Sequence, residues 1–232
     1  LRWRSRRGVA YGAAFTLAAA LAFTSKESAL TLPLLVALVL CFRLGVRAGL
    51  RAAAPWIALT SLPVAGYLAL RHHAVGQLVL ADHRNAILEN PLLGVAPLQR
   101  AALGVALLGR YLELCFAPST LRPDYSYAEI VPTLSDPRLI AELVATLAAA
   151  AAVPFLLRQS GVPRAAGFAL LWFLAAFALT ANVALPIGTV FGERLAYLPS
   201  VGPCLLLAAG AAALPSGPVR AFAVGALVVA FA

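Results

Sequence analysis

The sequence predicts an all-α protein, a polytopic bundle of transmembrane helices. Hydrophobic residues make up 62% of the 232 residues, and charged residues make up only 12%. Apolar runs close to the roughly 20 residues that a helix needs to cross a bilayer recur along the chain. Arginines gather at the ends of these runs, where topology-setting charge is usually found. A soluble domain of this size could not bury so much apolar surface, so lipid is the expected solvent.

We predict about seven spans. They lie near 8–24, 25–42, 53–70, 139–157, 165–181, 198–214 and 219–232. Four arginines precede the first predicted span, and three follow the second, which places both of these segments in the cytoplasm. The segments 71–138 and 182–200 then become the two long outer loops.

One more apolar segment, 98–117, has an amphipathic pattern. Its residues Gln99, Arg110 and Glu113 fall on one helical face, so we expect an interfacial or re-entrant helix rather than a span. If this helix does not cross, all nine acids of the chain lie on or near the outer face. If it does cross, the acid-bearing loop 118–138 lies inside instead. The charge pattern favours the first arrangement.

The outer loops contain the residues that are most suggestive of chemistry. Asp124, Tyr125 and Tyr127 combine a carboxylate with two phenols, which suits either an aromatic anchor at the membrane interface or the binding of sugar hydroxyls. In the second loop, Glu193, Arg194 and Tyr197 form either an exposed ion pair of little consequence or a site for a lipid phosphate.

A turn between the first two predicted spans, "FTSKESALTLP", contains the single lysine of the chain, Lys26. Thr24 and Glu27 have the spacing of a capping box, in which Thr24 begins a helix and Glu27 reaches back to it. The cap does not account for Lys26, which we expect to meet a lipid phosphate or a headgroup. A second cap is predicted at Asp136, followed by Pro137 in the first turn.

No cofactor or metal is predicted. His72, His73, Asp82 and His83 match no standard zinc spacing, and we expect interfacial histidines in a hydrogen-bonded loop. The three cysteines have no paired spacing and are expected to be small buried hydrophobes. Nucleic acid is not an expected partner, although the net charge is +9, because aromatic residues do not alternate with basic patches.

Four motifs in order carry a resemblance to a known family. They are "SKESALTLP", "NPLLG", "RYLELCFAPSTLRPDYSYAEIVP" and "GERLAYLPSVGPC". Together they resemble the transmembrane-and-tetratricopeptide-repeat proteins, the TMTC-type O-mannosyltransferases and their bacterial relatives, within the GT-C glycosyltransferase class. The resemblance implies a GT-C-like bundle that moves a mannose-like sugar from a polyprenyl-phosphate donor to a protein hydroxyl on the periplasmic or luminal side.

The resemblance also implies roles for the candidate residues. Lys26 and Glu27 would lie at the outer mouth of the site. The donor phosphate would be faced by Glu193, Arg194 and Tyr197. The acceptor or sugar would be lined by Asp124, Tyr125 and Tyr127. The chain has no methionine and ends within an apolar run, so we expect a fragment that lacks the family's N-terminal catalytic loop, with its key acid, and the C-terminal repeats.

Membrane lipid, a polyprenyl-phosphate sugar and an acceptor protein or glycan are the expected partners. Alternatives are an O-antigen ligase or polymerase that uses lipid-linked glycans, a transporter, and a non-catalytic scaffold that presents repeats. Charges at the ends of the spans argue against a transporter's midplane pathway. The arginine and alanine bias favours a GC-rich bacterium, and hence a plasma-membrane protein whose outer loops face the periplasm.

Overall fold

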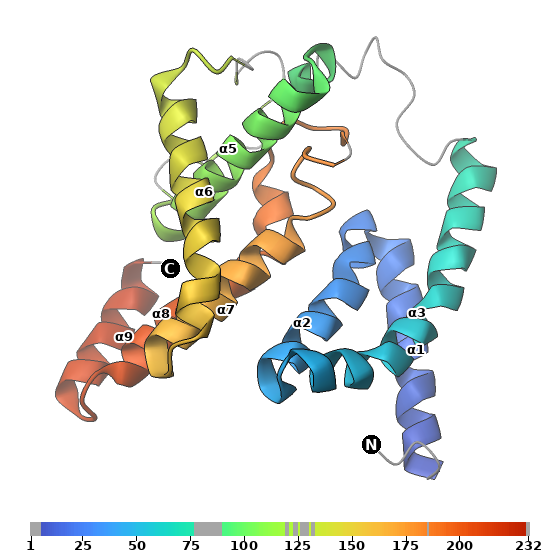
Figure 1. Ribbon diagram of the computed structural model, residues 1–232, viewed down its shortest axis with the longest axis horizontal. Helices are drawn as coiled ribbons and strands as arrows, with labels where there is room; N and C mark the ends of the chain where they lie inside the picture. The colour runs from blue at the N-terminus through green and yellow to red at the C-terminus, as the bar shows by residue number, and fades with distance from the viewer. Residues whose placement is uncertain are drawn as a thin grey trace. The chain divides into compact units, whose positions relative to one another are not determined.

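The described part of the chain is helical. The computed structural model describes residues 6–76, 90–118, 121–122, 125, 130, 133–184 and 186–230. These residues form eight α-helices and three short 3-10 helices, with no strand among them (Figure 1). The all-α prediction is therefore confirmed for this part of the chain. The helices belong to two compact units, which are treated separately below.

Unit 1 comprises Leu1–Ala101, Tyr125–Pro132 and Ala178–Val190. Its helices, in order, are α1 (Arg6–Ser25), η1 (Glu27–Thr31), α2 (Leu32–Leu44), α3 (Val46–Val75) and η2 (Pro91–Gly94). Helix α3 packs against both α1 and α2. A Cβ on Gly49 would lie 2.3 Å from the Cα of Cys41, so α2 and α3 meet backbone to backbone.

Unit 2 comprises Ala102–Asp124, Thr133–Phe177 and Phe191–Ala232. It holds most of α5 (Pro97–Phe116), then α6 (Pro137–Leu157), α7 (Gly161–Ala176), η3 (Glu193–Ala196), α8 (Val201–Ala213) and α9 (Pro218–Ala230). From α6 onward, each α-helix packs against the next along the chain. The contact of α7 with α8 is close, because a Cβ on Gly202 would lie 2.4 Å from the carbonyl oxygen of Ala169.

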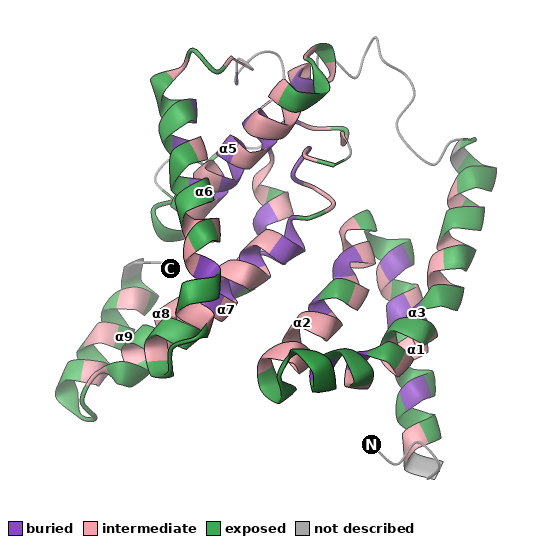
Figure 2. Cartoon of the chain, viewed as in Figure 1, coloured by how far each residue is buried: buried purple, intermediate pink, exposed green. Residues whose placement is uncertain are grey.

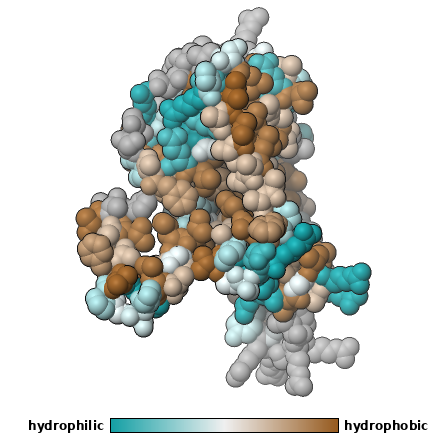
Figure 3. Space-filling view, turned by 60° about the vertical axis from the view of Figure 1, so that its left-hand side comes forward, coloured by the Kyte–Doolittle hydropathy of each residue, from teal (hydrophilic) through white to brown (hydrophobic). Residues whose placement is uncertain are grey.

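Within the described residues, four helical segments are long and apolar enough to cross a membrane, by length and composition. They are Gly8–Ser25, Glu27–Leu44, Val46–Ala74 and Pro137–Leu157. Many of their residues are exposed (Figure 2), and hydrophobic residues lie open over much of the face in Figure 3. An apolar exterior of this kind is suited to lipid rather than water.

The other three predicted spans coincide with apolar helices that are shorter than a typical span. These helices are α7, α8 and α9, with 16, 13 and 13 residues. The predicted range 165–181 was wrong at its end, because α7 stops at Ala176 and turns follow it. Likewise, helix α8 begins at Val201 rather than at 198, since residues 197–200 form turns after η3.

Helix α3 is longer than the predicted span 53–70. It begins at Val46, directly after Gly45, whose φ of +81° favours a glycine at this turn. It ends at Val75, so the segment predicted as the first outer loop is helical from 71 to 75. The helix contains Pro55 and Pro63 and changes direction along its length in Figure 1, as expected where proline removes backbone hydrogen bonds.

The capping box predicted at Thr24 is wrong. Helix α1 continues through Ser25, and the Thr24 hydroxyl donates to the carbonyls of Ala20 and Leu21 at 3.1 Å instead of capping a new helix. Serine and threonine commonly bond back to a helical carbonyl in this way. The extended residue before η1 is Lys26, and no side chain caps this helix.

The cap predicted at Asp136 is confirmed. The carboxylate of Asp136 accepts a hydrogen bond from the backbone N–H of Arg138 at 2.8 Å, and Pro137 occupies the first turn of α6. This cap fixes where α6 starts. It thereby places Arg138 and Glu142 one turn apart at the beginning of an apolar helix.

Candidate functional site

Four charged side chains of unit 2 form a network, here called the arginine–glutamate cluster. Glu142 lies at its centre: one carboxylate oxygen, Oε1, accepts from Arg110 Nε at 3.0 Å and from Arg138 Nε at 3.1 Å. Arg138 also donates through Nη2 to Glu113 Oε2 at 3.1 Å. The Glu142 side chain is 9% exposed, whereas that of Glu113 is 55% exposed. The cluster thus has one buried acid and one exposed acid.

The second oxygen of Glu142 is buried and has no hydrogen-bond partner among the described residues. Burying a carboxylate is expensive unless its oxygens are paired, so the two guanidinium groups must stabilise this one through Oε1 alone. The remaining oxygen can accept one more hydrogen bond. This unpaired oxygen, Oε2 of Glu142, is the most unusual polar feature of the cluster.

A glycine brings the two helices of the cluster together. A Cβ on Gly109 would lie 2.7 Å from the carbonyl oxygen of Glu142 and 2.9 Å from the hydroxyl of Thr146. Helix α5 therefore touches the backbone of α6 at this point, which a side chain would prevent. Arg110, the next residue along α5, is placed within hydrogen-bonding distance of Glu142 as a result.

Helix α5 also anchors the segment that precedes η3. Tyr111, which is 2% exposed, accepts from the N–H of Gly192 at 2.8 Å and donates to its carbonyl at 3.2 Å. The same ring stacks on Phe191 with centroids 4.0 Å apart and lies 4.5 Å from Phe177. This pairing fixes the backbone immediately before Glu193.

The three predicted donor-site residues of the second loop all lie at this anchored segment. Glu193 and Arg194 are in η3, and Tyr197 follows it with 85% of its surface exposed. Glu193 Oε1 accepts from the backbone N–H of Arg122 at 2.6 Å, which connects η3 to the segment that follows α5. Their predicted roles at a lipid phosphate remain predictions.

Lys26 and Glu27 belong to unit 1, at the turn that leads into η1. Glu27 Oε1 accepts from Arg71 Nη1 at 2.8 Å, and the same nitrogen donates to the Tyr67 hydroxyl at 3.0 Å. The end of α3 therefore lies beside the turn after α1. This contact puts Lys26, Glu27 and Arg71 at one end of unit 1, and their role at an outer mouth stays a prediction.

The first-loop candidates are only partly described. Tyr125 is half-buried in unit 1, whereas Asp124 and Tyr127 lie outside the described residues. His72 and His73 are exposed in the last turn of α3, while Asp82 and His83 also lie outside the described residues. No grouping of three or more metal-binding side chains occurs in the described part of the chain.

The three cysteines differ in solvent exposure more than the sequence predicts. Cys41 and Cys115 are partly buried, but Cys204 is exposed, so the prediction of a small buried residue is wrong there. Burial, assisted by the charge of Cys204, raises the pKa of the Cys115 thiol to about 11. A thiol with so high a pKa is protonated at neutral pH and is a poor nucleophile.

Two buried asparagines of unit 1 share a hydrogen-bond network, and sequence reasoning missed both. Asn90 and Asn182 are 0% and 2% exposed, and the Asn90 amide donates to Asn182 Oδ1 at 2.9 Å and to the Ile187 carbonyl at 2.7 Å. In turn, Asn182 accepts from Ile187 N at 2.9 Å and donates to the Thr189 carbonyl at 3.1 Å. Asn182 has a φ of +58°, which asparagine tolerates better than most residues.

We expect Asn90→Ala to lower the free energy of unfolding by about 1–3 kcal/mol, because it leaves buried backbone groups without partners. Asn182→Gly provides the comparison, since glycine keeps the positive φ and removes only the amide. The two changes should be less than additive, because they break one shared network. Thermal unfolding of the purified protein in detergent tests this expectation, and an unchanged melting temperature for Asn90→Ala would contradict it.

Glu142 is the functional candidate that the sequence analysis overlooked. A signal was present, because it is the one acid within the predicted span 139–157, and an ionisable residue within a span is by default a candidate for function. Its pairing with Arg110, 32 residues away, could not be read from periodicity. The cluster combines a proton acceptor with cationic hydrogen-bond donors.

The fold and the cluster define a helical protein with membrane-length apolar helices and a partly buried ionic site. No protein-family model, curated protein or solved structure matches this chain.

Proposed function

We propose that this chain is an integral membrane protein in which α1, α2, α3, α6, α7, α8 and α9 cross the bilayer and α5 does not. Arg158, Arg164 and Arg220 lie at or beside the α6–α7 and α8–α9 turns, and no acid occurs in these turns. Acid-free arginine turns are typical of the cytoplasmic side. The arginine–glutamate cluster then lies toward the outer face.

We further propose that the protein is a glycosyltransferase of the GT-C type. It would move a mannose-like sugar from a polyprenyl-phosphate donor to a protein hydroxyl on the periplasmic side. The resemblance of the four motifs suggests the reaction. The single observation that supports it best is the buried carboxylate of Glu142, in which Oε1 accepts from two guanidinium groups and Oε2 has no hydrogen-bond partner among the described residues.

The cluster offers the groups that this reaction needs. A carboxylate oxygen can accept the proton of an attacking hydroxyl, which then forms a bond to the sugar carbon as the bond to the phosphate oxygen breaks. A guanidinium group can stabilise the charge that develops on the departing polyprenyl phosphate. Arg110 is a suitable donor, because only its Nε is used by Glu142 and its side chain is 19% exposed.

Sugar transfer from a purified donor tests the proposal. The protein is reconstituted in nanodiscs with radiolabelled polyprenyl-phosphate mannose and an acceptor protein fraction from the periplasm. We expect labelled sugar to appear in the acceptor protein. Free polyprenyl phosphate should accumulate in equal amount, because each transfer releases one molecule of polyprenyl phosphate. A folded protein that transfers no sugar from a panel of such donors would favour the non-catalytic scaffold.

A further inference from the structure

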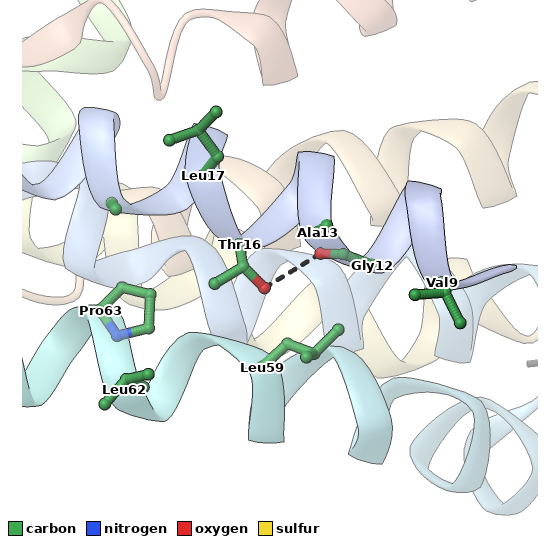
Figure 4. A pocket seen from close by; sticks show the side chains of 9 residues that line it. Val9, Gly12, Ala13, Thr16, Leu17, Leu59, Leu62 and Pro63 are labelled. Atoms are coloured by element: carbon green, nitrogen blue, oxygen red, sulfur yellow. Dashed lines mark hydrogen bonds between the residues drawn. The ribbon is translucent and has the colours of Figure 1, made fainter. Parts of the chain in front are cut away.

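An apolar groove lies between two helices of unit 1. It has a volume of about 680 Å³ and is bounded by α1 and α3 (Figure 4). Gly12 and Ala13 are among its residues on α1, while Leu59 and Pro63 belong to α3. Thr16 is the one polar side chain among the described residues that line it, and its hydroxyl already donates to the Gly12 carbonyl at 3.0 Å. The lining therefore presents a hydrocarbon surface.

The length of the groove fits a lipid chain. On α1 it runs from Val9 to Ala20, a rise of roughly 16 Å at 1.5 Å per helical residue. The hydrocarbon core of a bilayer is about 30 Å thick, so each leaflet contributes about 15 Å. Leu17 and Leu62 also line the groove and are exposed, so it is open along its side. An acyl chain of one leaflet can therefore enter from the side and lie along it.

Arginines occur at the end of the groove where Val9 lies. Arg6 and Arg7 are in the first turn of α1, and Arg7 precedes Val9 by two residues, roughly 3 Å along the helix axis. The sequence has no acid before Glu27, which follows the other end of α1, and none from 28 to 81. Three more arginines belong to the end of α2 and the start of α3, on the same side in the proposed topology: Arg43, Arg47 and Arg51. An anionic headgroup would balance this charge.

We propose that the groove holds one acyl chain of an anionic phospholipid of the cytoplasmic leaflet, with its headgroup beside Arg6 and Arg7. This inference rests on the membrane-spanning part of the proposed function and not on sugar transfer. A second copy of the chain is the main rival, because the small residues of α1 would also suit helix packing. Two copies in one membrane share an orientation, however, so their arginine-rich ends would meet and repel each other. A negatively charged lipid offsets that charge instead of doubling it.

Photolabelling tests this proposal. The protein in nanodiscs is exposed to phosphatidylglycerol or phosphatidylcholine, each with the same diazirine-bearing acyl chain, and labelled peptides are identified by mass spectrometry. We expect phosphatidylglycerol to label α1 and α3 at least fivefold more than phosphatidylcholine does, about 1 kcal/mol, which one arginine near the membrane surface can supply. Helix α9 contributes no residue to this groove and is the internal reference, which both lipids should label alike.

Ala13→Trp tests the groove itself. It places an indole in the groove and should lower phosphatidylglycerol labelling of α1 and α3 roughly tenfold, which corresponds to about 1.4 kcal/mol. Ala14→Trp is the matched control, because Ala14 is an exposed neighbour on the same helix that does not line the groove. Its labelling should stay within a factor of two of the unaltered protein. Equal labelling of the two variants would overturn the proposal.

A double change, Arg6→Gln with Arg7→Gln, tests the headgroup. It should reduce phosphatidylglycerol labelling about fivefold or more and leave phosphatidylcholine labelling within a factor of two. Arg158→Gln with Arg164→Gln is the control, since it removes the same charge beside the turn between α6 and α7 in unit 2 and should change neither. If the two double variants behaved alike, no headgroup would be held at the arginines and the proposal would fail.

Two further results contradict the proposal. Equal labelling of α1 and α3 by the two lipids would mean that the groove holds bulk lipid only. A disulfide crosslink between Leu62→Cys residues of two copies, together with loss of labelling, would mean that a second copy of the chain fills it. A protein that does not enter nanodiscs overturns both this inference and the membrane assignment. Sugar transfer is measured separately, so its failure overturns the proposed reaction alone.

Discussion

Glu142→Gln is expected to lower the turnover rate of sugar transfer about 100-fold or more, which is the usual effect of losing a general base. Glutamine has nearly the same size and keeps an oxygen for the guanidinium groups, but its amide cannot take up a proton. The change therefore removes the chemistry while disturbing the packing little. Initial rates at saturating donor, with the donor KM measured separately, distinguish this loss from weaker binding.

Glu113→Gln is the control for this prediction. Glu113 bonds the same arginine, Arg138, but its side chain is 55% exposed, so its contribution should be small. We expect a rate within about fivefold of the unchanged protein, consistent with an exposed ion pair worth up to about 1 kcal/mol. A folded Glu142→Gln protein with the original rate would exclude this carboxylate as the base. Size-exclusion chromatography and thermal unfolding establish that each variant is folded.

Gly202→Ala is expected to reduce the free energy of unfolding by about 1–3 kcal/mol, the cost of overpacking a close contact. The new Cβ would lie 2.4 Å from the carbonyl oxygen of Ala169 in α7, so α7 and α8 must separate. Because that neighbour is backbone, no side chain can simply move aside. A lower melting temperature in detergent is the expected result.

Gly210→Ala tests the same substitution on the same helix without the contact. Nothing lies within 4 Å of a Cβ at Gly210. Alanine is a better helix former than glycine by up to about 1 kcal/mol, so this variant should be as stable as the original or more so. If both variants melted at the same temperature, the packing of α7 on α8 would not depend on Gly202.

The sequence predicted the helical class because long apolar runs are marked by composition alone, but it did not give every boundary, since α3, α7 and α8 differ from their predicted ranges. The ranges for α1, α6 and α9 agree with the structure to within about two residues. The cap at Asp136 was also predictable, since it depends only on neighbouring residues. The cap at Thr24 failed because the apolar run of α1 continues past it, and a helix already in progress uses the hydroxyl for its own carbonyls.

The candidate site was only partly predictable. Glu193, Arg194 and Tyr197 were singled out as a polar group in a loop between apolar runs; their roles stay predictions, and the structure adds that Tyr111 anchors their segment. Glu142 was missed because its importance comes from burial and from Arg110 on another helix. No local sequence pattern encodes a contact between residues that are 32 positions apart. Asn90 and Asn182, which are 92 positions apart, were missed for the same reason.

The pair of buried asparagines has a consequence for biosynthesis. Asn90 and Asn182 are 92 residues apart, so at 5–20 residues per second Asn182 leaves the ribosome roughly 5–18 s after Asn90. During that interval, Asn90 has emerged without the partner that satisfies its amide. Unit 1 can close only after α6 and α7, which belong to unit 2, have been synthesised. The two units are therefore completed in an interleaved order.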